Sequence, residues 1–236
     1  MTQDGRRFFV TFAADSSQRV RLFSHRENTP FSRWKTRRQL RADDPQAAMA
    51  RGLRADSGDS VYLVHQNNDV GRDGRYGVAR YDKKDDRWPN RAYFGSENDG
   101  ARVHSFALTS SFELCLSSRL RGNLLVTCGT MVDLDRERKF FDNQSLSRRY
   151  PSSIVEGADG TLYVAFSPGD NSELKVAIRS PDGSWSVERV FGGSTFGIST
   201  AIDRTGDLVL TFYTCAGAGD GCSLKIIRER PDQLKR

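Results

Sequence analysis

Glu113 and Glu156 are the two carboxylates whose placement could support acid–base chemistry. Each belongs to a short strand-like segment, 113–117 or 152–156, that precedes a glycine-containing turn. If these segments are the inner strands of adjacent repeats, the two side chains could converge. Hydrolysis of a glycosidic bond uses two carboxyl groups roughly 5–10 Å apart. The alternative is that each carboxylate is a solvated or ion-paired structural group, so both are weak catalytic candidates.

Other patterns of catalytic or metal-binding residues are absent from the sequence. There is no Ser-His-Asp order, phosphate-binding loop or dinucleotide fingerprint, and the glycine-rich stretch 217–221 is expected to be a loop between strands. His25, His65 and His104 stand far apart, and the cysteines lack the close spacing typical of zinc sites. We therefore expect neither a metal centre built from these residues nor an organic cofactor.

The four cysteines predict two local disulfides. Cys115 and Cys128 flank a hairpin turn centred on Arg121 and Gly122, so they should lie directly opposite each other on paired strands. Cys215 and Cys222 bracket the loop Ala-Gly-Ala-Gly-Asp-Gly. Free thiols are the alternative. Disulfides form in oxidising compartments, which predicts an extracytoplasmic protein that is secreted, periplasmic or on the cell surface.

A turn containing glycine, followed by a short alternating strand, recurs five times along the chain. The strands after these turns span residues 8–12, 61–65, 124–128, 162–166 and 208–212. Each is expected to be the second strand of a repeat. No segment shows a sustained helical period, so repeats of this length indicate propeller blades and not helical solenoids.

The repeat predicts an all-β fold, a β-propeller of about five four-stranded antiparallel blades. A tryptophan opens the fourth strand in three units, at Trp34, Trp88 and Trp185, and is expected to pack between neighbouring blades. We expect one domain with blades at about 6–41, 46–95, 101–149, 150–192 and 193–230. The first unit lacks an inner strand and the last stops soon after its third. Either the ring closes by sharing strands between the two ends, or part of the protein is missing; in radial order the first and last units are expected to be neighbours.

One stretch resembles a known repeat. Residues 185–190, 197–206 and 208–213, with Leu224 and Lys225, are similar to the sialidase-like or BNR-like blades of secreted bacterial β-propeller proteins. The match is good over 150–228, looser over 6–95 and poor over 129–149. The resemblance implies a propeller fold and export, and it implies little about activity, because propellers host enzymes, lectins and scaffolds.

The sialidase motifs themselves are degenerate here. The Asp-box of that family, Ser-x-Asp-x-Gly-x-x-Trp, is matched only by the shorter Ser180-Pro181-Asp182-Gly183-Ser184-Trp185. The Phe-Arg-Ile-Pro signature, expected near the first strand, is missing, and Arg149-Tyr150-Pro151 matches it only weakly and far from that strand. An arginine triad and a Tyr–Glu pair cannot be assigned.

The loops between second and third strands are the expected ligand-binding surface, because binding residues concentrate in loops on a rigid scaffold. These loops are expected at 14–18, 67–74, 131–137, 168–172 and 216–221, and each contains aspartate. The predicted ligand contacts are Asn68, Asp69, Arg72, Asp170, Asn171 and Asp220. Their oxygen atoms could hold sugar hydroxyls or a hard cation such as calcium. Alternatively, aspartate and asparagine are there because they favour turns.

Composition narrows the function classes. The net charge is +6, but basic residues are interleaved with 30 acidic ones, which makes nucleic acid an unlikely partner. No apolar segment approaches the ~20 residues that cross a bilayer. The leading hypothesis is a non-enzymatic extracytoplasmic binding module that recognises a glycan or a surface protein through one propeller face. The alternatives are a degenerate sialidase-like or five-bladed glycoside hydrolase, and a structural blade array of a larger surface protein.

Overall fold

A computed structural model describes most of the chain after residue 101 and mainly the strands before it. The described residues are 6–12, 20–26, 35–39, 47–55, 60–67, 76–82, 87–94, 102–134, 136–146, 152–170, 172–215 and 221–230. Before residue 103, side chains are described only at 54, 60–64 and 77–81.

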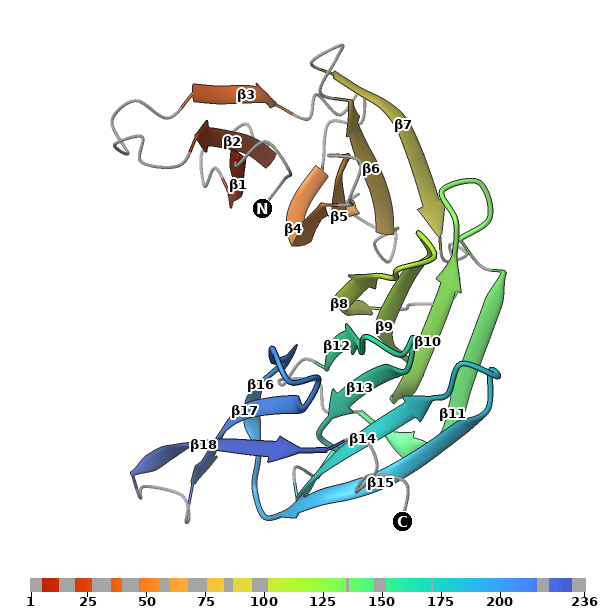
Figure 1. Ribbon diagram of the computed structural model, residues 1–236, viewed down its shortest axis with the longest axis vertical. Helices are drawn as coiled ribbons and strands as arrows, with labels where there is room; N and C mark the ends of the chain where they lie inside the picture. The colour runs from red at the N-terminus through yellow and green to blue at the C-terminus, as the bar shows by residue number, and fades with distance from the viewer. Residues whose placement is uncertain are drawn as a thin grey trace. The chain divides into compact units, whose positions relative to one another are not determined.

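The described residues form eighteen β-strands and no helix, which confirms the predicted all-β class (Figure 1). The first sheet contains β1 (Arg6–Phe12), β2 (Val20–Arg26) and β3 (Lys35–Gln39). The second contains β4 (Ala47–Ala55), β5 (Val61–Asn67), β6 (Tyr76–Asp82) and β7 (Arg87–Phe94). The third contains β8 (Arg102–Leu108), β9 (Leu114–Leu120), β10 (Asn123–Gly129) and β11 (Glu137–Ser145).

The fourth sheet contains β12 (Ser153–Glu156), β13 (Leu162–Phe166), β14 (Glu173–Arg179) and β15 (Trp185–Gly192). The fifth contains β16 (Phe196–Ile202), β17 (Leu208–Cys215) and β18 (Cys222–Glu229). In every sheet, strands that follow one another in the chain are neighbours in the sheet. The middle three sheets are four-stranded, as predicted for complete repeats, and the first and last have three described strands each.

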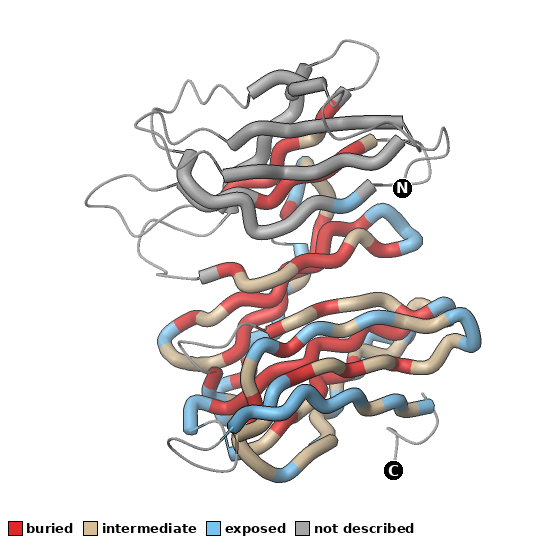
Figure 2. The backbone as a smooth tube through the Cα atoms, turned by 90° about the vertical axis from the view of Figure 1, so that its left-hand side faces the viewer, coloured by how far each residue is buried: buried red, intermediate tan, exposed pale blue. Residues whose placement is uncertain are grey.

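The chain divides into two compact units. One comprises Met1–Val103 with Gly129–Arg136, and the other comprises His104–Cys128 with Glu137–Arg236. In the first unit, the described core lies on β5 and β6, where Leu63, Val64, Val78 and Ala79 are fully buried. The second unit contains two larger apolar cores. Figure 2 shows many residues along its strands as buried.

In the second unit, β13 contributes to both cores because its side chains alternate between the two faces of the fourth sheet. Leu162, Val164 and Phe166 pack in the core shared with the third sheet. Tyr163 and Ala165 pack in the core shared with the fifth. The fourth sheet is therefore covered on both faces by its neighbours, which is the packing expected of a blade between two others.

Trp185 occupies the position predicted for it. Its indole packs edge-on against Phe141 of β11, with ring centroids 5.3 Å apart, so it lies between the third and fourth sheets. Trp34 lies outside the described residues, and of Trp88 only the backbone within β7 is described.

The first hairpin turn of the fourth and fifth sheets has one common geometry. In residues 157–161 and 203–207, the fourth residue is a glycine with positive φ, +82° at Gly160 and +87° at Gly206, and its N–H donates to the carbonyl three residues earlier. In both turns the N–H of the first residue also donates to the carbonyl of the fifth. The same two backbone hydrogen bonds close residues 109–113, where Phe112 has φ +63°. Glycine adopts this left-handed conformation without the steric cost that other residues bear.

The predicted assignment of strands in the third repeat was therefore wrong, because its first hairpin turn contains Phe112 and not Gly122. Gly122, with φ +97°, lies in the two-residue turn between β9 and β10, which are the second and third strands of that sheet. Residues 124–128 thus belong to the third strand, and the first strand is β8. Glu113 lies in the turn before β9 and not on an inner strand. The loop 131–137 connects third to fourth strands. The expected glycine signal was missing because a phenylalanine occupies its place.

Both predicted disulfides are present. Cys115 and Cys128 join β9 to β10 with their Cα atoms 4.1 Å apart. Cys215 and Cys222 are direct register partners of β17 and β18, with Cα atoms 4.2 Å apart. Among the described residues no cysteine is free.

Candidate functional site

The hairpins of the second unit present turns at two opposite ends of the strands. We call the end with the turns between first and second strands the first-turn end, which contains residues 109–113, 157–161 and 203–207. The second-turn end contains the connections between second and third strands, at residues 121–122, 167–172 and 216–221. The carboxylate pair predicted from the sequence lies at the first-turn end. Of the predicted ligand loops, 168–172 connects second to third strands at the second-turn end, whereas 131–137 connects third to fourth strands.

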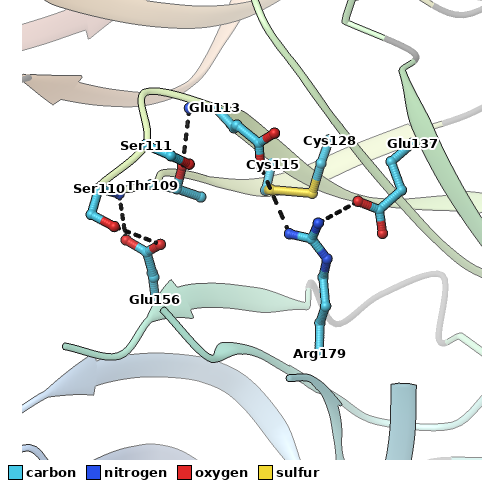
Figure 3. The surroundings of a disulfide bond; sticks show 9 residues. All are labelled: Thr109, Ser110, Ser111, Glu113, Cys115, Cys128, Glu137, Glu156 and Arg179. Carbon is cyan, nitrogen blue, oxygen red and sulfur yellow. Dashed lines mark hydrogen bonds and ion pairs between the residues drawn. A yellow bond between two sulfur atoms is a disulfide. The ribbon is translucent and has the colours of Figure 1, made fainter. Parts of the chain in front are cut away.

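At the first-turn end, Glu156 is bound by the turn of the neighbouring sheet. Its Oε2 accepts the backbone N–H of Ser110 at 2.6 Å, and its Oε1 accepts the Ser110 hydroxyl at 3.2 Å (Figure 3). Glu156 is the last residue of β12, so this contact ties the first strand of the fourth sheet to the first hairpin turn of the third.

Arg179 makes a second connection between the same two sheets. From the end of β14, its guanidinium lies between two carboxylates of the third sheet (Figure 3). Nη2 donates to Oε2 of Glu137 at 2.5 Å, and Nη1 lies 3.8 Å from Oε2 of Glu113. The side chains of Arg179 and Glu113 are only 20% and 11% exposed, so this ion pair is screened less than a surface pair.

Two buried polar atoms near this end have no hydrogen-bond partner among the described residues, Nε of Arg179 and the hydroxyl of Tyr163. Burial, and to a smaller extent the charge of Asp159, raises the pKa of Tyr163 above its usual value. The phenol therefore stays neutral at physiological pH.

This geometry favours a structural interpretation of Glu113 and Glu156. Each carboxylate contacts a group of the other sheet, Arg179 for Glu113 and Ser110 for Glu156. A glycosidase needs one carboxyl as a proton donor and the other facing the sugar. Contacts that hold neighbouring sheets together are what a propeller core requires, and the catalytic hypothesis for the pair stays a prediction.

At the second-turn end, Asp170 is the one predicted ligand contact that falls within the described residues. It is exposed, and its Oδ1 accepts the backbone N–H of Ser172 at 3.1 Å. That hydrogen bond is the main cause that lowers the pKa of Asp170, so its carboxylate is charged above acidic pH. The other predicted contacts, Asn68, Asp69, Arg72, Asn171 and Asp220, lie outside the described residues.

Aspartates at other turns support the alternative that this residue type is there to form turns. Asp159, Asp182 and Asp203 each accept the N–H of the residue two positions later, as Asp170 does. Asp182, in the shortened Asp-box, lies in the turn between β14 and β15, and its Oδ1 also accepts the Ser184 hydroxyl. Side-chain caps of this kind stabilise tight turns locally.

No sequence pattern indicated the partners of Glu113 and Glu156. Ser110 is 46 residues from Glu156, and Arg179 is 66 residues from Glu113 and 42 from Glu137. To infer these contacts from the sequence, one would have to assign each strand of the third repeat correctly and then assume that successive repeats pack against each other.

Comparison with known proteins supports the fold alone. No family model and no curated protein matches the chain. Solved structures do: the intramolecular trans-sialidase from Ruminococcus gnavus aligns over 92% of this chain and 51% of its own, with TM-score 0.59 and 10% identity. A mutant of the GH43 protein BlXynB from Bacillus licheniformis aligns over 99% and 52%, with TM-score 0.53 and 8% identity.

A protein of unknown function from Dyadobacter fermentans aligns over 96% of this chain and 76% of its own, with TM-score 0.60 and 10% identity. The sialidase and GH43 neighbours are β-propeller proteins. The chain therefore has a propeller-like fold, and it spans about half the length of the trans-sialidase and of the GH43 protein.

Two further properties concern the described residues only. They contain no helix long and apolar enough to span a membrane. They also contain no group of three or more histidine, cysteine, aspartate or glutamate side chains placed to hold a metal ion.

Proposed function

We propose that the chain is a non-enzymatic, extracytoplasmic binding module that recognises a glycan or a surface protein through its second-turn end. The observation that carries the proposal is that Glu113 and Glu156 both make contacts between sheets. The loops between second and third strands are then the remaining candidates for a ligand-binding site. The Cys215–Cys222 disulfide closes the loop that contains Asp220. A loop restrained in this way loses less conformational entropy on binding, and disulfides support a compartment outside the cytosol.

We propose further that residues 1–236 form one propeller domain and that the five sheets are its successive blades. The stacking of the last three sheets and the propeller-like neighbours support this arrangement. It implies that the first and last blades are adjacent, as the sequence repeat predicts. Thiol cross-linking between one cysteine introduced within residues 6–12 and one within residues 208–214, followed by mass spectrometry, should connect the two segments, and the absence of such links would contradict a closed ring.

Screening the oxidised protein against a glycan array and surface proteins tests the binding function. We expect the variant Asp69→Ala/Asp170→Ala/Asp220→Ala to lose the binding that the wild type shows, because three carboxylates of the ligand loops are removed. Its melting temperature should stay nearly unchanged, since Asp170 is exposed. Asp142→Ala, at an exposed position of β11, is the matched control and should bind normally.

The outcomes separate the proposal from its rivals. Normal binding by the triple variant would place the site elsewhere. A wild type that binds no glycan or protein but hydrolyses chromogenic glycosides, with the activity lost in Glu113→Gln or Glu156→Gln, would identify the second candidate, a glycoside hydrolase. The sialidase and GH43 neighbours are the observation that favours this candidate. A wild type that shows neither binding nor hydrolysis would favour the third alternative, a structural blade array.

A further inference from the structure

The outer strand of the fourth sheet, β15, has a free edge. It is the fourth strand of a four-stranded sheet and, among the described residues, it pairs only with β14 (Figure 1). The two faces of this sheet are covered by the cores shared with the third and fifth sheets, and all residues of both cores belong to the second unit. Only the edge of β15 is therefore open within this unit. A free edge presents unpaired backbone N–H and C=O groups that can bond to another strand.

The outer strands of the first three sheets contain residues that discourage pairing, and β15 does not. Three of the five residues of β3 are basic, β7 contains Pro89, and β11 contains Arg138 and Lys139. Basic residues and proline on an outer strand normally prevent edge-to-edge association. β15 contains neither proline nor lysine, and its register with β14 is regular from Trp185 to Arg189. This regular stretch can therefore accept a partner strand.

The side chains of β15 leave two polar groups for such a partner. Successive side chains alternate between the two faces of the sheet. Trp185 and Val187 pack partly buried against the core shared with the third sheet, and Arg189 lies on the same face. Ser186 and Glu188 lie on the opposite face. Within the part of the chain that the structure describes, neither of these two side chains has a hydrogen-bond or ion-pair partner.

We propose that β15 pairs in antiparallel orientation with β15 of a second copy of the chain, around a two-fold axis at Val187. Ser186 of each copy then stands opposite Glu188 of the second copy, and its hydroxyl donates a hydrogen bond to that carboxylate. On the other face Trp185 stands opposite Arg189, a cation–π pair. Each contact occurs twice, so the surface is self-complementary, as a two-fold dimer interface must be.

Charge selects this register. A two-fold axis leaves every side chain on its own face of the sheet, so a residue can stand opposite only itself or a residue an even number of positions away. An axis at Glu188 or at Arg189 would place like charges directly opposite each other, which is unfavourable. An axis at Ser186 would place Arg189 opposite Gly183, beyond the beginning of the strand. The axis at Val187 keeps all five regular residues paired.

The packing of β15 prepares its edge for association. Its neighbours hold the strand extended on both faces, since Trp185 and Val187 pack against one core and Val190 and Phe191 against the other. Little conformational entropy is therefore lost when a second strand pairs with it. A single pair of strands buries a small interface, so we expect a weak, reversible dimer. The proposal is independent of ligand binding, because β15 contains none of the predicted ligand contacts.

Analytical ultracentrifugation of the oxidised full chain over a range of concentrations at low salt tests the proposal. We expect a reversible dimer for the wild type. Ser186→Glu should raise the dimer dissociation constant about fivefold or more, because it places two carboxylates opposite Glu188. Ser186→Lys should lower the constant about fivefold, because it makes two ion pairs at the same positions. The double variant Ser186→Glu/Glu188→Lys should dimerise at least as well as the wild type.

The two substitutions at one exposed position separate this register from other modes of association. Ser186 is exposed, so circular dichroism should give nearly the same melting temperature for all four proteins in their monomeric range, which shows that each variant is folded. A wild type that stays monomeric up to its solubility limit would overturn the proposal. A dimer that Ser186→Lys weakens, as an axis at Ser186 requires, or one that neither substitution changes, would also overturn it.

Discussion

Replacing Cys115 and Cys128 together by alanine is expected to lower the free energy of unfolding by about 3 kcal/mol, the loss estimated for opening a loop of this size. The disulfide closes a loop with a sequence separation of 13 residues. Both cysteines are buried in the core shared by the third and fourth sheets, so the substitution also removes apolar contacts. Urea denaturation should show a lower midpoint and a somewhat steeper slope, because the denatured chain without the cross-link is less compact and exposes more surface.

The second disulfide is the internal control for this prediction. The Cys215–Cys222 bridge closes a loop with a separation of 7 residues at the edge of the fifth sheet. Its removal by alanine substitution should cost less, about 2 kcal/mol, because shorter loops lose less entropy on closure. A Cys115→Ala/Cys128→Ala variant as stable as the wild type, or one affected less than the second pair, would contradict the expectation.

Local features of the fold were predictable from the sequence. The disulfides follow from the symmetry of two hairpins, and the turns at Gly160 and Gly206 follow from a residue type that tolerates positive φ. The position of Trp185 follows from the recurrence of tryptophan before the fourth strand. Each of these inferences needs only a short segment and one physical rule.

The errors in strand assignment arose in the third repeat, where the first hairpin turn has no glycine. Phe112 adopts the conformation that glycine takes in the equivalent turns, so the search for glycine selected Gly122 and shifted the third repeat by one strand. As a result, Glu113 was assigned to an inner strand and residues 131–137 to the wrong loop. The partners of Glu113 and Glu156 come from other sheets, and such contacts depend on packing that no short segment encodes.

The largest electrostatic effect is expected at Arg179. Arg179→Met keeps most of the aliphatic length but removes the guanidinium that lies between Glu113 and Glu137. Their side chains are 11% and 33% exposed. Removing one partner of a buried ion pair leaves charge poorly compensated, so we expect a loss of about 3 kcal/mol, at the lower end of such losses because the cluster is partly exposed. The midpoint of urea denaturation measures it.

Two variants separate this effect from a general loss of packing. Arg189→Met removes a 65% exposed arginine that pairs with Glu173 at 3.2 Å, and it should cost less than about 0.5 kcal/mol because exposed pairs are weak. The triple variant Arg179→Met/Glu113→Gln/Glu137→Gln removes the charges left behind and should regain more than half of the lost stability. If the triple variant is no more stable than Arg179→Met, the loss comes from packing and not from unpaired charge. If Arg179→Met matches Arg189→Met, the guanidinium does not hold the third and fourth sheets together.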